Sequence, residues 1–322
     1  MASAMVALLL LRLLLALALA LVAAAPEAYQ ALLLQQGDIR PSARKQAVAA
    51  AGWLFGGTDG GVARNDLWQY AASGSDGWSH LGGEGSGQRG VYSNLGGAAF
   101  VDPAAAPAPP VPWPGGRAGA TLFSVDVSET GSLYLFGGHG TGGSGRTGYL
   151  NDLWIFMGAQ DGWVWWGGSD EVDQPSTLCP AQGTECQQLC PSTGGNADSI
   201  ALVACSWPGW RRSAAFWQAH HDSVYMFGGV GCDAFSCHAF HSLNDLWWYA
   251  DDAFHFIQGS LRANEVGRYP GTLGTSATSH QFIWPGSRSA ASGWYDPVAK
   301  TGVIFGGKGC DAVECASYSY LN

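Results

Sequence analysis

Residues 113–117 read W-P-G-G-R, residues 133–138 read L-Y-L-F-G-G and residues 150–154 read L-N-D-L-W, and this order of blocks decides the fold. The blocks recur along the 322-residue chain, with the arginine at Arg44, Arg117, Arg211 and Arg288, F-G-G at Phe55, Phe136, Phe227 and Phe305, and N-D-L-W at Asn65, Asn151 and Asn244. Seventeen residues separate Phe227 from Asn244, and also Phe305 from Asn322, the last residue. We therefore expect four copies of one unit, with the fourth stopping inside the repeat.

Each unit predicts four short antiparallel strands, because apolar and aromatic runs at hairpin spacing are typical of such strands. The double glycine marks a point where a side chain would clash or where φ must be positive. The strands are expected at 44–48, 52–55, 66–70 and 77–81, at 117–123, 133–136, 153–156 and 163–166, and at 212–216, 224–227, 246–249 and 254–257. The fourth repeat supplies only two, around 289–291 and 303–305.

Four-stranded units in tandem indicate a β-propeller, in which each unit buries its faces against its neighbours. The Arg, the Gly pair, the aromatic residue on strand three and the Trp on strand four resemble the kelch pattern of the galactose-oxidase-like superfamily, in its long-repeat subgroup. Over residues 40–322 this resemblance implies an all-β, kelch-type β-propeller of four-stranded antiparallel blades, with about three and a half blades present. The repeats are placed at 40–112, 113–206, 207–283 and 284–322, the last truncated.

The repeats exceed the kelch unit of about 50 residues, since successive arginines lie 73, 94 and 77 residues apart. The excess precedes each new first strand, at residues 83–112, 169–206 and 260–283, and Y-S-N-L-G at 92–96 is echoed by Y-P-G-T-L-G at 269–274. Long loops on one face are where recognition is usually found. Residues 26–39 are expected to form an N-terminal strand that could close the ring, and an incomplete sequence or a partner is favoured over a four-blade ring.

The composition excludes several classes of protein. Fifteen Trp argue against disorder, and 47 Gly without a three-residue period argue against collagen. A net charge of -10 without a basic stripe argues against nucleic acid as a partner.

The first 25 residues stand apart from the repeats. Arg12, an apolar run and the small residues 23–25 indicate a secretory signal peptide over residues 1–25, and hence a secreted protein. The alternative is an uncleaved anchor over residues 6–22, which would make the protein membrane-bound.

Eight cysteines fit an oxidising compartment. The C-x4-C spacing of Cys232 with Cys237 and of Cys310 with Cys315 favours two local disulfides over zinc. The others, Cys179, Cys186, Cys190 and Cys205, lie in one insert with three possible pairings. Near Cys237, His238 and His241 offer a C-H-x-x-H alternative, but no metal site is predicted, because Cys237 has an obvious disulfide partner.

The W-P-G-x-R entries carry the candidate binding residues, which are Arg44, Arg117, Arg211 and Arg288 with Trp113, Trp207 and Trp284. The resemblance implies arginines lining a pocket at the mouth of a central channel, where guanidinium groups suit carboxylates or phosphates and Trp faces suit sugars. The favoured alternative is packing: each Arg bonds carbonyls of the neighbouring blade and each Trp lies between blades. Recurrence in every repeat is what a packing role demands.

No catalytic set is predicted. The Asn-Asp pairs are interpreted as turn residues with local side-chain-to-backbone bonds. The copper ligands of galactose oxidase, the sialidase Asp-box, G-x-S-x-G, H-E-x-x-H and the P-loop are missing. We therefore expect a non-catalytic scaffold, without a cofactor, that binds a protein segment or a glycan through its loop face. The alternatives are part of an extracellular carbohydrate-active oxidase whose catalytic portion is missing, and a surface display module held by an uncleaved N-terminal segment.

Overall fold

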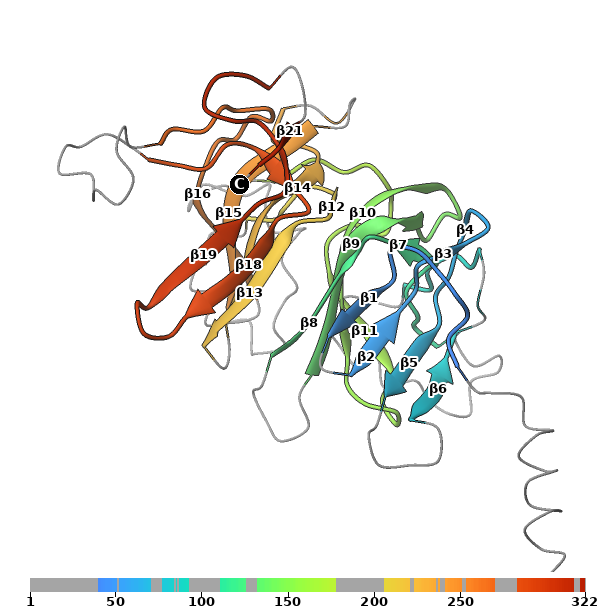
Figure 1. Cartoon of the computed structure of the whole chain (residues 1–322). Coiled ribbons are helices and arrows are strands. Elements are labelled where there is room, and N and C mark those ends of the chain that lie inside the picture. Colours follow the sequence, from blue (N-terminus) through green and yellow to red (C-terminus); the bar gives the residue numbers. More distant parts are fainter. Residues whose placement is uncertain are drawn as a thin grey trace, which may run out of the picture. The chain divides into compact units, whose positions relative to one another are not determined.

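The computed structural model describes residues 40–50, 52–70, 77–83, 85, 87–92, 111–125, 132–177, 206–220, 223–235, 237, 241–250, 253–269, 283–315 and 319–321. These residues form strands, turns and loops (Figure 1), and none of them belongs to a helix long and apolar enough to cross a membrane. The segments predicted at 1–25 and 26–39 lie outside the described residues.

The chain separates into two compact units, Met1–Pro41 with Tyr70–His80, and Ser42–Gln69 with Leu81–Asn322. In the first unit, the rings of Tyr70 and Trp78 meet edge to face at 5.2 Å. The second unit holds the Arg and Gly-Gly blocks of all four repeats and the Asn-Asp blocks of repeats one to three.

Repeats one to three each build one antiparallel sheet. The first has the order β1 (Val48–Ala50), β2 (Trp53–Phe55), β5 (Leu67–Tyr70) and β6 (Trp78–Gly82), with a small hairpin of β3 (Thr58–Asp59) and β4 (Val62–Ala63). The second contains β7 (Arg117–Ala118), β8 (Thr121–Val125), β9 (Ser132–Thr141), β10 (Thr147–Phe156) and β11 (Trp163–Gly167). The third contains β12 (Arg211–Arg212), β13 (Ala215–His220), β14 (Ser223–Gly231), β15 (His241–Ala250) and β16 (Ala253–Gln258). The expected all-β class and the positions of the second, third and fourth strands are confirmed. The first strand differs: in repeat one it is Val48–Ala50 rather than 44–48, and in repeats two and three it is broken in two.

Repeat four is split into two small sheets. One pairs β18 (Ser292–Asp296) with β19 (Thr301–Phe305), and the other has the order β17 (Arg288–Ser289), β20 (Lys308–Gly309) and β21 (Ser319–Tyr320). The β18–β19 ribbon, red in Figure 1, lies beside β13, because Gly293 and Gly302 let the ring of Trp217 approach both strands.

The middle strands of repeats two and three are longer than the sequence predicted. Strands β9 and β14 run on through their Gly pairs, and the register with β10 and β15 shifts at that point. Both glycines of each pair have positive φ, for example 64° at Gly137 and 98° at Gly138. A side chain there would be strained, so the double glycine allows a bulge inside a continuous strand.

The first glycine of each pair also lies against the next repeat. A Cβ at Gly56 would stand 2.5 Å from the carbonyl oxygen of Arg117, and one at Gly137 would stand 2.8 Å from that of Arg211. Both predicted reasons for the double glycine, a clash and a positive φ, are therefore confirmed.

The core lies between consecutive repeats. One apolar cluster joins Phe55 and Leu67 of repeat one to Leu135 and Trp154 of repeat two, and a second joins repeats two and three. Phe55, Phe136 and Phe227 are 0%, 1% and 1% exposed. Burying a phenylalanine of this kind contributes about 2–3 kcal/mol.

A chain of backbone hydrogen bonds links four equivalent positions, each two residues after the repeat's arginine. Gly119 N–H donates to Gln46 C=O (2.9 Å), Ser213 to Gly119 (3.3 Å) and Ala290 to Ser213 (2.8 Å). All four residues have positive φ, between 54° and 62°. This conformation interrupts the first strand, which is why β7 is separate from β8 and β12 from β13.

Candidate functional site

In repeats one to three the predicted arginine forms an ion pair inside its own repeat. Arg117 donates to both carboxylate oxygens of Asp152 at 2.6 and 2.8 Å, and Arg211 donates to both of Asp245 at 2.9 and 2.8 Å. Arg44 donates to Asp66 at 2.6 Å. The Trp two residues after each Asp donates its indole N–H to the same carboxylate, through Trp68, Trp154 and Trp247. Each N-D-L-W block is therefore a carboxylate held by a guanidinium and an indole.

Each of these carboxylates faces the opposite charge of its arginine. The side chains of Arg117 and Asp152 are 0% exposed, and although burial acts in the opposite direction, the Asp152 charge raises the pKa of Arg117. Burial also acts to raise the pKa of Asp66, but the hydrogen bonds from Arg44 and Trp68 lower it below its ordinary value. Bidentate, desolvated pairs of this kind hold a fixed geometry. The interpretation of these aspartates as local turn residues is wrong, since they bind an arginine 22 to 35 residues away.

Arg288 is the exception. It is 5% exposed and donates to the carbonyls of Gly286 and Gly306, but its Nη2 donates to the Tyr269 hydroxyl at 2.6 Å. Among the described residues no carboxylate forms an ion pair with it.

The tryptophan of each W-P-G block forms a hydrogen bond with the preceding repeat. The indole N–H of Trp113 donates to Asn65 C=O at 2.8 Å, and the Asn65 side chain donates to Pro114 C=O at 3.4 Å. The same reciprocal pair joins Trp207–Pro208 to Asn151 and Trp284–Pro285 to Asn244. The packing role that the sequence analysis favoured for these tryptophans matches this geometry.

The two ends of each of the three long inserts are joined by a pair of backbone hydrogen bonds. Val91 and Trp113 exchange two backbone hydrogen bonds, at 2.9 and 3.2 Å. Thr177 exchanges two with Trp207, at 2.8 and 2.7 Å, and Arg268 two with Trp284, at 2.8 and 3.0 Å. The two ends of the inserts 92–112, 178–206 and 269–283 therefore lie at equivalent positions. At each, the residue before the insert pairs with the Trp that binds the preceding repeat.

Two of these inserts begin with a tyrosine whose hydroxyl forms a hydrogen bond at the buried arginine site of the following repeat. The Tyr92 hydroxyl donates to Asp152 at 2.6 Å, and burial and the Asp152 charge raise the pKa of Tyr92 well above 10. Tyr269 takes the equivalent place at Arg288. The Y-S-N-L-G and Y-P-G-T-L-G echo is the sequence signal for this role, which the sequence analysis noted without assigning a role to the tyrosines.

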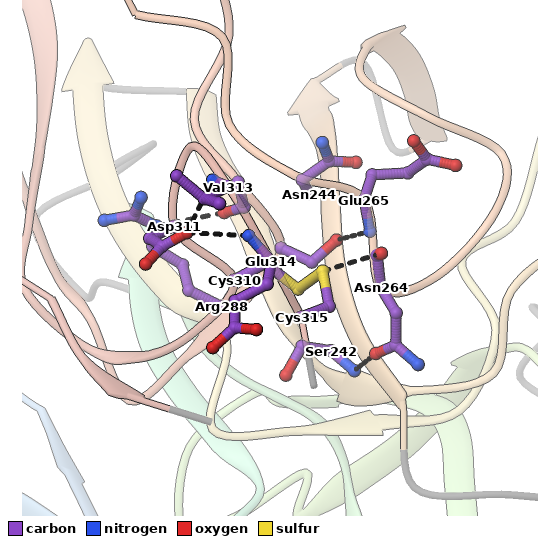
Figure 2. Close-up of a disulfide and its surroundings, with 12 residues drawn as sticks. Ser242, Asn244, Asn264, Glu265, Arg288, Cys310, Asp311, Val313, Glu314 and Cys315 are labelled. Atoms are coloured by element: carbon purple, nitrogen blue, oxygen red, sulfur yellow. Dashed lines mark hydrogen bonds between the residues drawn. A yellow bond between two sulfur atoms is a disulfide. The ribbon is translucent and has the colours of Figure 1, made fainter. Parts of the chain in front are cut away.

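Two predicted disulfides are confirmed, Cys232–Cys237 and Cys310–Cys315. Figure 2 shows the second, where the carboxylate of Asp311 turns into its own loop and accepts hydrogen bonds from the amides of Val313 (2.6 Å) and Glu314 (2.9 Å). The Asp311 carbonyl accepts from the amide of Gly267 at 2.7 Å, so this loop braces the base of the third insert. The disulfide pairs fit an extracellular location.

The binding residues predicted from the sequence are distributed over the four repeats. The structure places Arg44, Arg117 and Arg211 in buried pairs, Arg288 against Tyr269, and Trp113, Trp207 and Trp284 between repeats. Cys179, Cys186, Cys190 and Cys205, and His238, lie outside the described residues. Within the described ranges, no three His, Cys, Asp or Glu side chains are grouped to hold a metal ion.

No protein-family model and no curated protein sequence matches the chain. A solved structure titled "Structure of YjhT" superposes with a TM-score of 0.35 at 12% identity, over 84% of this chain and 73% of that one.

Proposed function

We propose that this chain is a secreted β-propeller of the kelch type, acting as a non-catalytic binding scaffold. In this proposal the three inserts form the recognition surface, and the ligand is a protein segment or a glycan. Loops held by a rigid scaffold are a common place for recognition.

The observation that carries the proposal is the paired backbone hydrogen bonding at the base of every insert. Val91–Trp113, Thr177–Trp207 and Arg268–Trp284 recur at the same point of three repeats, so the ends of the three inserts lie at equivalent positions. By contrast, Arg117 and Arg211 donate hydrogen bonds to backbone carbonyls and to an aspartate of their own repeat. We therefore assign recognition to the inserts and leave these two arginines out of the ligand site.

The test replaces residues 93–111, 178–205 and 270–282 with short Gly-Ser linkers while keeping the six bridge residues. Wild type and variant are applied to arrays of immobilised glycans and of peptides. We expect wild type to bind members of one array, and the variant to lose that binding at an unchanged melting temperature. Which array responds distinguishes a glycan from a protein segment.

The matched control replaces residues 126–131, the connection between β8 and β9, with the same linker. It should leave binding unchanged. Full binding by the variant that lacks all three inserts would contradict the proposal.

A further inference from the structure

The junction between repeats two and three carries a set of side chains that the other two junctions do not have. Repeat two supplies His139, directly after its Gly pair, and Tyr149, two residues before its Asn-Asp pair. Repeat three supplies Trp210 and Arg212, on either side of Arg211. The residues at these four positions are Thr58, Ala63, Gly116 and Ala118 at the first junction, and Val230, Ser242, Ser287 and Ser289 at the third. Three rings and a guanidinium are therefore a property of the second junction.

These four side chains form one cluster. The rings of Tyr149 and Trp210 stack, with centroids 4.1 Å apart and an angle of 21° between their planes. The ring of His139, on the neighbouring strand, lies 4.6 Å from that of Tyr149, and the guanidinium carbon of Arg212 lies 5.8 Å from the Tyr149 centroid. Trp210 is 2% exposed, whereas His139, Tyr149 and Arg212 are half-buried. The cluster thus extends from the interior to the surface.

Closure of the junction does not require these side chains. At each junction the residue before the conserved Arg donates its amide to a carbonyl that precedes the insert: Gly116 to Gln88 at 2.8 Å, Trp210 to Gln174 at 3.0 Å and Ser287 to Glu265 at 2.9 Å. A glycine and a serine therefore make the same backbone contact as Trp210. The buried indole N–H of Trp210 also has no hydrogen-bond partner among the described residues, which is costly for a ring that serves packing alone.

A carboxylate lies beside the cluster. Asp173 accepts the amide of Tyr149 at 2.9 Å and donates its own amide to the Tyr149 carbonyl at 2.7 Å. In repeat three the neutral Asn264 holds Ser242 by the same two bonds, at 3.1 and 2.8 Å. The negative charge of Asp173, which is exposed at the surface, is thus not needed for this brace.

The cluster presents two neutral polar rings between charges of opposite sign. Burial and the Arg212 charge lower the pKa of His139, and Asp173 acts in the opposite direction. The imidazole is therefore neutral at neutral pH and has one donor and one acceptor nitrogen. Burial raises the pKa of Tyr149, so its hydroxyl keeps its proton. Because Arg212 only donates and Asp173 only accepts, together they suit hydroxyl groups, which do both.

We propose that this cluster binds an uncharged sugar residue of a glycan. The apolar C–H face of the sugar packs on the rings of His139 and Tyr149, since both surfaces then leave water. Arg212 donates to oxygens of the sugar, and Asp173 accepts from its hydroxyls. Aromatic walls with a few placed polar groups are typical of small-ligand sites.

This inference rests on the proposed function and narrows its ligand to a neutral glycan. Asp173 lies shortly before the second insert and Trp210 shortly after it, so the site adjoins the surface that the proposed function assigns to recognition. The opposite charges of Arg212 and Asp173 balance each other, which favours an uncharged sugar over a carboxylate-bearing one.

The probes are fluorescein-labelled, β-linked hexasaccharides of glucose, mannose and galactose, with hexagalacturonate as the carboxylate-bearing arm. Each is titrated with the full chain and followed by fluorescence anisotropy. We expect saturable binding of at least one neutral hexasaccharide, and weaker binding of hexagalacturonate. Absence of binding by all the neutral probes would overturn the proposal, as would tighter binding of hexagalacturonate than of any neutral probe.

Protein variants locate the site. Arg212→Met and Asp173→Asn, the second copying Asn264, should each weaken binding of the neutral probe about tenfold, because each loses a charged hydrogen bond. Tyr149→Ser copies Ser242 and should weaken binding at least as much, because it removes the ring that the sugar covers. Arg212→Met and Asp173→Asn leave the stacked rings in place, so they test the site even if Tyr149→Ser does not fold.

The matched control is Arg262→Met, which removes another guanidinium that lies over an aromatic ring, 4.8 Å from the centroid of Phe235. It should bind the neutral probe like wild type. Equal binding by wild type, Arg212→Met, Asp173→Asn and Tyr149→Ser would overturn the proposal.

Replacement of residues 178–205 by a linker separates this site from the proposed function. Loss of binding on that replacement, with unchanged binding by Arg212→Met and Asp173→Asn, would keep the proposed function and overturn the site. Loss of binding in Arg212→Met and Asp173→Asn, with full binding after the replacement, would support the site and contradict the role of the second insert.

Discussion

Phe136 and Phe305 occupy the same position in repeats two and four, yet one is 1% and the other 60% exposed. The arginines of the two repeats differ in the same way, since Arg117 binds a carboxylate and Arg288 a tyrosine hydroxyl. In repeat two a single strand, β10, supplies both the cover and the charge, because Leu153 and Asp152 are neighbours on it. The third strand thus supplies both groups in repeat two, whereas in repeat four the first two strands form around an arginine that pairs with no carboxylate of the described residues.

The largest expected effect comes from exchanging the two arginines for methionine. Arg117→Met leaves the buried carboxylate of Asp152 without its cation and should lower the free energy of unfolding by about 3–5 kcal/mol. Arg288→Met strands carbonyl oxygens but no carboxylate of the described residues, so about 1–2 kcal/mol is expected. Urea unfolding followed by Trp fluorescence measures both. Equal losses would break the comparison between the repeats.

Truncating the two phenylalanines should give the next contrast. Phe136→Ala opens a cavity in the core between repeats two and three and should lower the free energy of unfolding by about 3–5 kcal/mol. Phe305→Ala removes a mostly exposed ring and should cost less than about 1 kcal/mol. The same urea titrations check this pair, and a large loss for Phe305→Ala would show that the face of repeat four is covered in solution.

The positions with positive φ provide a smaller test. A Cβ at Gly119 would meet no atom closer than 3.6 Å, so Gly119→Ala measures the backbone conformation alone and should lower the free energy of unfolding by about 1 kcal/mol. Ser213→Gly relieves the same conformation in repeat three, at φ 55°, and should raise it by up to about 1 kcal/mol. Opposite signs are required, and thermal unfolding of the two variants determines them.

The smallest effect concerns pH and distinguishes a repeat with a carboxylate from one without. The folded-state pKa of Asp66 lies below its unfolded value, because hydrogen bonds from Arg44 and Trp68 outweigh burial. Its contribution to stability is therefore present above the unfolded pKa and is lost as pH falls through the lowered folded pKa. Urea midpoints at pH 7 and pH 3 should differ less for Asp66→Asn than for wild type. An unchanged difference would remove Asp66 from the acid sensitivity.

Local patterns predicted the strands well, because F-G-G and N-D-L-W each report on a few neighbouring residues. They failed where the partner was distant. Asp152 resembles a turn residue beside Asn151, and only the fold brings Arg117 to it across 35 residues. The tryptophans were easier to interpret, since a large apolar ring that recurs in each repeat has to be packed. Tyr92 and Tyr269 could have been found by asking what a repeated polar ring at the start of an insert touches.

The linked backbone positions Gln46, Gly119, Ser213 and Ala290 have a consequence for measurement. Gly119 and Ser213 use both their N–H and their C=O groups on other repeats and neither on their own sheet. Amide exchange at Gly119, Ser213 and Ala290 therefore reports the separation of neighbouring repeats, independently of the melting of any one sheet. The exchange rates of these three amides therefore measure the stability of the three junctions between repeats, one amide for each junction.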